Sequence, residues 1–113
     1  MINEGGSIKN LQRDLDMAML ESEWQKEVIA YAQAHDWLVA HCRPARTAKG
    51  WRTPMQGDPG FPDLCCARNS VVLLIELKRW GGYATREQMD WLEAGEGYCW
   101  TPEQRRFMEE VLA

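Results

Sequence analysis

The stretch VVLLIELK, residues 71–78, constrains the fold more than any other part of the chain. Every residue from Val71 to Ile75 is apolar, although successive side chains of a strand point to opposite faces. A continuous apolar run therefore predicts a strand that is covered on both faces, as in a central sheet between helices. We expect an α/β domain built around a mixed β-sheet.

Periodic apolar residues predict where the other elements lie. Helices are expected over about 22–35, 85–94 and 101–112, and strands over 37–42, 63–67, 71–78 and 97–100. The turn "RNS" joins two of these strands in a hairpin. Residues 43–62 are rich in proline and glycine, and we expect a long irregular loop of the kind that usually carries function.

Polar residues at fixed spacing predict the helix starts. Ser22 followed by Gln25, and Thr85 followed by Gln88, have the spacing of capping boxes, in which each side chain binds the backbone of the other residue. A third cap begins at Thr101, with proline at the first helical position.

The length of 113 residues fits one domain. We divide the chain into an N-terminal arm or short helix at residues 1–21 and a domain at residues 22–113. Neither a signal peptide nor an apolar run long enough to span a membrane is visible, so we expect a cytoplasmic protein without a membrane partner. The cysteines form no C-x-x-C pair, and Cys65 and Cys66 are expected to be packed thiols.

The net charge of −4 excludes a generally basic nucleic-acid binder, but the charges are unevenly distributed. The segment HCRPARTAKGWR begins at His41 and contains cations but no acid. Such a local basic loop could hold phosphates, whereas a solvated surface loop is the plainer interpretation. The candidate DNA-binding residues of this segment are His41, Arg43, Arg46, Lys49 and Arg52.

Three charged residues near the ends of the hairpin strands indicate a site. Glu76 and Lys78 are two residues apart and therefore point to the same side of their strand, and the hairpin brings Asp63 to the same end. Two carboxylates at close range repel each other, and a divalent cation such as Mg²⁺ stabilises both. Alternatively, Asp63 caps a turn and Glu76 and Lys78 form a surface ion pair.

The same residues resemble a known motif. Pro62-Asp63 followed by Glu76-Leu77-Lys78 is similar to the PD-(D/E)XK motif of nucleases. In chain order, SEWQKEVIAYAQAHDWLVAHCRPART, GWRTPMQGDPGFPDL, IELK and REQMDWL resemble the VRR-NUC subgroup in its small stand-alone form, common in phage genomes. The resemblance extends from about Ser22 to Trp100.

The resemblance implies a restriction-endonuclease-like α/β core, with a central mixed sheet flanked by helices. It implies that Asp63, Glu76 and the backbone carbonyl of Leu77 bind Mg²⁺ or Mn²⁺, and that Lys78 is the catalytic lysine. It also implies a structure-selective endonuclease that acts as a homodimer on branched DNA such as four-way junctions, in a bacterium or a phage-infected cell. Two further catalytic residues are expected, Glu23 and Gln88.

These two further residues have competing interpretations. Glu23 in a first helical turn would favour the helix dipole without any catalytic role, and Glu27 competes with it as the helix carboxylate. Gln88 has a structural role in its capping box. His41 as a general base competes with a hydrogen-bonded histidine at a strand end. Among the tryptophans, the ones expected in the core are Trp24, Trp37 and Trp91.

Two other functions compete with that of a nuclease. One is a module that binds DNA without cutting it, against which the complete set of Asp63, Glu76 and Lys78 argues. The other is an interaction or regulatory protein that uses the Met-rich N-terminal arm, with Met17 and Met19, and the acidic surface. The salt dependence of DNA binding separates these functions, because phosphate contacts make affinity fall steeply with ionic strength.

Overall fold

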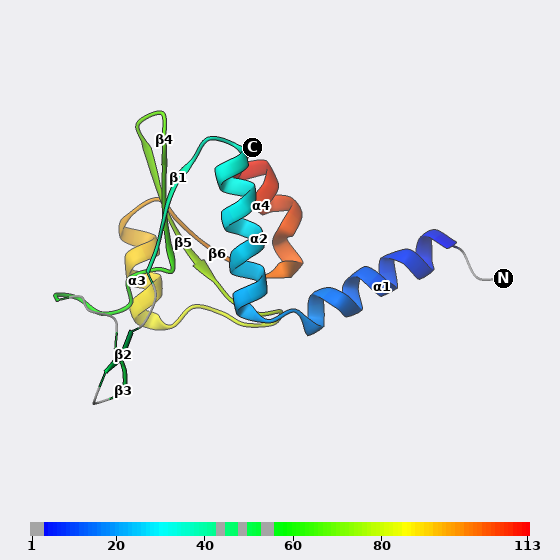
Figure 1. The fold of residues 1–113 in the computed structure, drawn as a ribbon, viewed down its shortest axis with the longest axis horizontal. Helices are drawn as coiled ribbons and strands as arrows, with labels where there is room; N and C mark the ends of the chain where they lie inside the picture. The colour runs from blue at the N-terminus through cyan, green and yellow to red at the C-terminus, as the bar shows by residue number, and fades with distance from the viewer. Residues whose placement is uncertain (1–3, 43–44, 48–49, 53–55) are drawn as a thin grey trace.

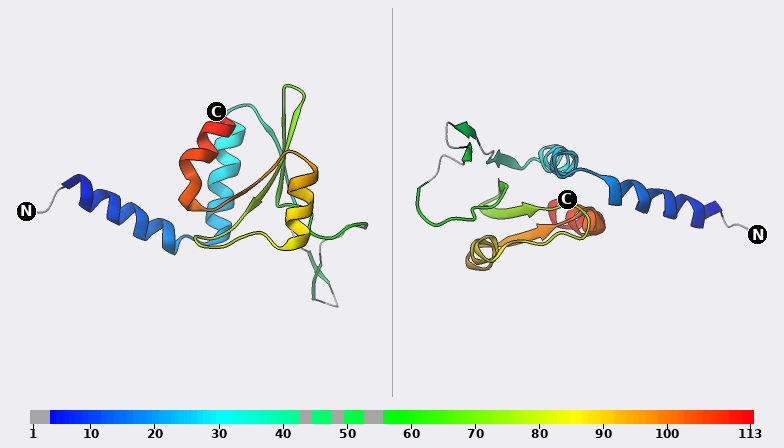
Figure 2. Two further views of the ribbon diagram at one scale, coloured as in Figure 1. Left: turned by 180° about the vertical axis from the view of Figure 1, so that it is seen from behind. Right: turned by 90° about the horizontal axis from the view of Figure 1, so that it is seen from below.

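The computed structural model describes residues 4–42, 45–47, 50–52 and 56–113. In this part of the chain, a sheet of four strands lies between α2 on one side and α3 on the other (Figures 1 and 2). The helices are α1 (Glu4–Ala18), α2 (Glu21–Ala34), α3 (Arg86–Ala94), the 3₁₀ helix η1 (Pro102–Gln104) and α4 (Arg105–Leu112). The strands are β1 (Leu38–His41), β2 (Ala45–Thr47), β3 (Gly50–Arg52), β4 (Leu64–Arg68), β5 (Val71–Leu77) and β6 (Gly97–Trp100).

The sheet has the order β1-β4-β5-β6. β4 pairs antiparallel with both β1 and β5, whereas β5 and β6 are parallel. A mixed sheet flanked by helices confirms the expected α/β class and is consistent with a restriction-endonuclease-like core. The expected hairpin between β4 and β5 is also confirmed.

The second half of β5 is covered on both faces, as the sequence predicts. On one face, Leu73, Ile75 and Leu77 are buried in a hydrophobic cluster with residues of α2 and α4. On the opposite face, Leu74 is half-buried and Glu76 is buried. The first half differs, because Val71 and Val72 are exposed. These two residues lie at the turn end of the β4–β5 hairpin, which extends past the helices in Figure 1.

Two of the three tryptophans expected in the core are buried there. Trp24 donates its indole N–H to the Trp100 carbonyl at 3.0 Å, and Trp37 donates to the Leu112 carbonyl at 2.8 Å. The first bond joins α2 to β6, and the second joins the residues just after α2 to α4. Trp91 is only half-buried and donates to the Pro59 carbonyl at 3.0 Å.

The N-cap of helix α2 lies two residues before the proposed cap at Ser22. Leu20 is the N-cap residue, and its backbone N–H donates to the Glu23 carboxylate at 2.9 Å. Ser22 therefore lies inside the first turn, and Glu23, at the third position, accepts the bond that a capping box requires. The expected box of Thr85 and Gln88 is confirmed, with bonds of 2.8 and 3.2 Å.

The segment expected to be an irregular loop contains an antiparallel pair of strands. β2 and β3 pair through Ala45 with Arg52, Arg46 with Trp51 and Thr47 with Gly50. Gly50 has φ of 102°, a conformation that favours glycine and allows the chain to reverse direction at the start of β3. Three-residue strands are too short to give a readable alternation in the sequence.

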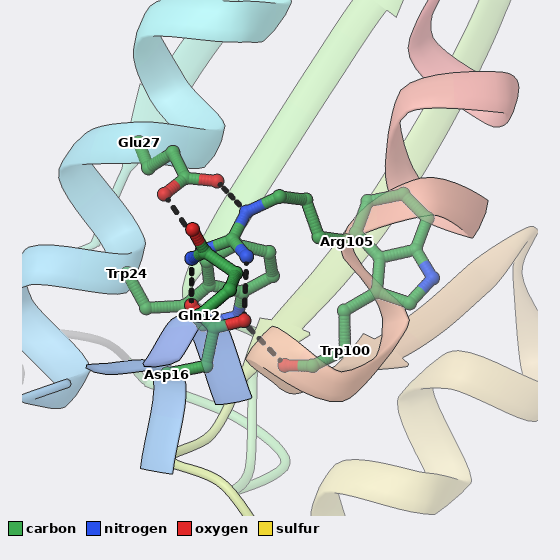
Figure 3. A network of polar contacts seen from close by, with 6 residues as sticks. All are labelled: Gln12, Asp16, Trp24, Glu27, Trp100 and Arg105. Atoms are coloured by element: carbon green, nitrogen blue, oxygen red, sulfur yellow. Dashed lines mark hydrogen bonds and ion pairs between the residues drawn. The ribbon is translucent and has the colours of Figure 1, made fainter. Parts of the chain in front are cut away.

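An ion-pair network attaches α1 to the rest of the molecule (Figure 3). Arg105 of α4 donates to Asp16 of α1 at 2.7 Å and to Glu27 of α2 at 2.6 and 3.1 Å. Asp16 is buried, whereas the preceding turns of α1 project away from the sheet (Figure 1). Among the described helices, none is long and apolar enough to cross a membrane.

Candidate metal centre

Two neighbouring strands bring Asp63 and Glu76 together. Leu64 of β4 pairs with Ile75 of β5, so the residues just beyond this pair, Asp63 and Glu76, adjoin each other. The backbone N–H of Asp63 donates to Glu76 Oε1 at 3.2 Å, and the N–H of Leu77 donates to Asp63 Oδ2 at 3.0 Å. These reciprocal bonds fix both carboxylates against the backbone of the opposite strand.

Lys78 lies on the same side as Glu76, as strand alternation requires. Its Nζ is 3.2 Å from Glu76 Oε2, and the lysine side chain keeps 21% of its surface exposed against 2% for the glutamate. The backbone N–H of Lys78 donates to the Trp100 carbonyl of β6 at 3.0 Å. The ammonium group thus reaches solvent beside a buried carboxylate, where it could contact a phosphate or water.

A third carboxylate comes from the first residue of α2. One oxygen each from Glu21, Asp63 and Glu76 lie within 4.8 Å of one another. This spacing allows a single small cation to contact all three, and oxygen donors are the ligands that Mg²⁺ and Mn²⁺ favour. The donor set therefore fits the expected ion.

The structure does not bring Glu23 or Glu27 into this cluster. Residues two apart on a helix point in nearly opposite directions, so Glu23 faces away from Glu21 and binds the backbone of Leu20. Glu27 is bound to Arg105. The sequence did not identify Glu21 as a candidate ligand, because a helix that starts after Ser22 leaves Glu21 outside its first turn.

Burial and mutual repulsion determine the protonation of the cluster. Desolvation, followed by the charge of Asp63, raises the pKa of Glu76 to about 7, although Lys78 opposes this rise. Burial and the same aspartate also raise the pKa of Glu21, opposed by Lys78 and Arg79. Near neutral pH Glu76 of the metal-free cluster is therefore partly protonated, and a divalent cation would displace this proton.

Two further groups are expected in the site, the backbone carbonyl of Leu77 and the side chain of Gln88. Leu77, whose carbonyl is an expected ligand, lies between Glu76 and Lys78, with its N–H held by Asp63. Gln88 uses its Oε1 to accept the N–H of Thr85, which is its capping role.

The expected DNA-binding residues begin with His41, the last residue of β1. His41 is half-buried and lines a cavity of about 530 Å³ together with Glu21 and Asp63. Arg46 and Arg52 belong to β2 and β3 by their backbones. Arg43, Lys49 and the side chains of Arg46 and Arg52 lie outside the described part of the structure.

Two of the cysteines, Cys66 and Cys99, are poor candidates for a competing site. Burial raises the pKa of Cys66 to about 11, and burial also raises that of Cys99, which pairs with Glu76 across β5 and β6. Thiols with raised pKa values are poor metal ligands and nucleophiles at neutral pH. Cys66 is packed in the core as expected, and Cys65 is half-buried.

Comparisons of the chain with protein-family models, with curated proteins and with solved structures gave no match.

Proposed function

We propose that this protein is a metal-dependent DNA endonuclease that hydrolyses phosphodiester bonds. The observation that carries the proposal is the convergence of Glu21, Asp63 and Glu76 within 4.8 Å, next to Lys78. This convergence supports the resemblance to PD-(D/E)XK nucleases of the VRR-NUC type, because the motif residues meet in space and a helix carboxylate joins them.

The three carboxylates would hold Mg²⁺ or Mn²⁺. Such an ion, when bound, supplies a water of lowered pKa and offsets the charge of the phosphate. The backbone bonds of Asp63 and Glu76 keep their oxygens in place before substrate arrives, which reduces the reorganisation required during the reaction.

Lys78 contributes positive charge beside the scissile phosphate. Its Nζ is held by Glu76 and is partly exposed, so it can donate a hydrogen bond to the attacking water or to a phosphate oxygen. The reaction breaks one P–O bond and forms another, and the leaving oxygen takes up a proton. Lys78 therefore stabilises the charge that develops in the transition state.

The substrate and partner follow from the resemblance. We expect branched DNA, such as a four-way junction, and a homodimer whose two sites cut at a fixed spacing. The exposed Ile8, Leu11 and Leu15 of α1 offer an apolar stripe that a second copy could cover.

A cleavage assay tests the function. Linear, flapped and four-way DNA are incubated with the protein in Mg²⁺, in Mn²⁺ and in EDTA, with an Asp63→Asn variant as the control. We expect cleavage only with metal, and a loss of about 10²-fold or more in the variant, the scale of removing an electrostatic contact to a transition state. Metal-independent cleavage, or an equally active variant, would contradict the proposal. Binding without cleavage would favour the non-cutting module.

A further inference from the structure

A cavity beside the carboxylates follows the first two turns of α2. Glu21 and Asp63 form one end of its lining, and Gln25 and Lys26 continue it along the helix. Gln25 is one helical turn after Glu21 and half-buried, and Lys26 is exposed. The groups next to the metal cluster on this side are thus an amide and a cation, both of which donate hydrogen bonds to phosphate.

At α3, by contrast, the charged residues that line a second hollow in the described part of the chain are all carboxylates. This hollow of about 280 Å³ is lined by Asp58, Glu87 and Asp90, together with Trp91. The nearby Arg86 is already paired with Asp90 at 3.3 Å. Because like charges repel, a DNA backbone is disfavoured along α3, which lies across the sheet from α2 in Figure 2.

The spacing along α2 suits neighbouring phosphates. Lys26 is five residues after Glu21, which corresponds to about 7.5 Å along the helix axis. A DNA strand carries one phosphate per roughly 3.4 Å of duplex axis. A strand that runs along α2 with its scissile phosphate at the carboxylates therefore presents to Lys26 a phosphate about two nucleotides away.

The geometry points to α2 as the track of the cleaved strand: Gln25 and Lys26 bind phosphates that neighbour the scissile one. This inference rests on the proposed function, because the carboxylate cluster defines where the scissile phosphate lies. Gln25 and Lys26 act as positioning residues, since they contact the DNA backbone and not the reacting atoms. Contacts of this kind fix the register of the strand without reading its bases.

Salt-dependent binding tests the track. The affinity for a fluorescent four-way junction is measured over a range of salt concentrations in an Asp63→Asn background, with Lys26→Ala compared with Lys9→Ala. Lys9 is an exposed cation on α1 and is the matched control for charge. Lys26→Ala should weaken binding and reduce the salt slope by about 1, the value for one lost phosphate contact, whereas Lys9→Ala should leave both unchanged. Equal slopes for both variants would overturn the inference.

Two further measurements distinguish a failure of this inference from a failure of the proposed function on which it rests. In the active protein, Lys26→Ala should raise KM and leave kcat nearly unchanged, and Lys26→Arg should restore KM. If the active protein cuts DNA but Lys26→Ala changes neither KM nor the salt slope, the track is wrong and the nuclease stands. If no DNA is cut but Lys26→Ala still reduces the salt slope, the DNA track stands and the nuclease fails.

A variant on α3 tests the alternative path of the strand. Glu87→Gln removes a negative charge from α3 and should leave the salt slope of DNA binding unchanged. A large change in this slope would place the strand on α3 instead.

Discussion

At the scale of single residues, Glu76 is a buried carboxylate whose pKa the fold raises. Its side chain is 2% exposed and adjoins Asp63, and its pKa is raised from 4.5 to about 7. Between these two values the folded protein holds a proton that the unfolded chain has released. The free energy of unfolding therefore decreases as pH rises through this window, for the metal-free protein.

Replacing this residue should remove that pH dependence. In EDTA, wild type should lose stability relative to Glu76→Gln between about pH 4.5 and pH 7. Urea denaturation of both proteins across this range measures the difference, with Glu110→Gln as the control for an exposed carboxylate. Parallel curves for wild type and Glu76→Gln would contradict the raised pKa.

Adding Mn²⁺ should stabilise wild type and release about one proton per ion from Glu76.

Glu21 and Glu23 form a natural pair for mutation. Glu21→Gln should weaken Mn²⁺ binding and lower the cleavage rate, because it removes one carboxylate of the cluster. Glu23→Gln should leave both nearly unchanged, because its carboxylate binds the backbone of Leu20 outside the cluster, and should cost about 1 kcal/mol or less in stability. Calorimetric titration with Mn²⁺ and a cleavage time course measure the effects. Loss of activity in Glu23→Gln alone would restore Glu23 as the helix carboxylate.

At the scale of elements, Arg105 joins α1, α2 and α4. Arg105→Ala would leave the buried Asp16 without its ion-pair partner, and breaking a buried pair costs on the order of 3 kcal/mol. Arg106 is the matched control, since it is 95% exposed and, among the described residues, pairs with Glu110 on its own helix. Arg106→Ala should change the free energy of unfolding by about 0.5 kcal/mol or less. Urea denaturation measures both values, and equal losses would contradict the role of the network.

The sequence predicts those elements whose signals are local. Alternation along one strand places Glu76 and Lys78 on one side, and a short turn brings Asp63 to them, so most of the cluster can be read from the chain. Glu21 could not be predicted, because its role depends on where α2 begins. That start is set by a backbone bond from Leu20 to Glu23, whereas the Ser22 pattern suggested a later start.

Two other differences between the predicted and the observed elements also have physical causes. The exposure of Val71 and Val72 depends on how far the hairpin extends past the helices, which a run of apolar residues does not reveal. The pairing of β2 with β3 involves strands of only three residues each, below the length at which period-two alternation is informative.

At the scale of the whole molecule, α1 projects from the body of the protein (Figure 1) and carries an apolar stripe of exposed side chains. Ile8, Leu11 and Leu15 are 68%, 61% and 57% exposed, and their spacing places them on one side of the helix. If the expected homodimer forms through this stripe, Leu11→Glu should give the mass of one chain where wild type gives that of two. Light scattering after size-exclusion chromatography measures the mass. Asn10→Glu is the control, since Asn10 is exposed beside the stripe, and dissociation of both variants, or of neither, would argue against this interface.

The central claim is that Glu21, Asp63 and Glu76 together hold one divalent cation. A crystal soaked in MnCl₂ tests it most directly, through the anomalous signal of manganese. We predict one strong peak at about 2.0–2.2 Å from an oxygen of each of the three carboxylates, and no such peak in Asp63→Asn crystals. The claim would be contradicted if the three carboxylates converge but no anomalous peak lies between them. The manganese concentration must be one that saturates the magnesium sites of other proteins.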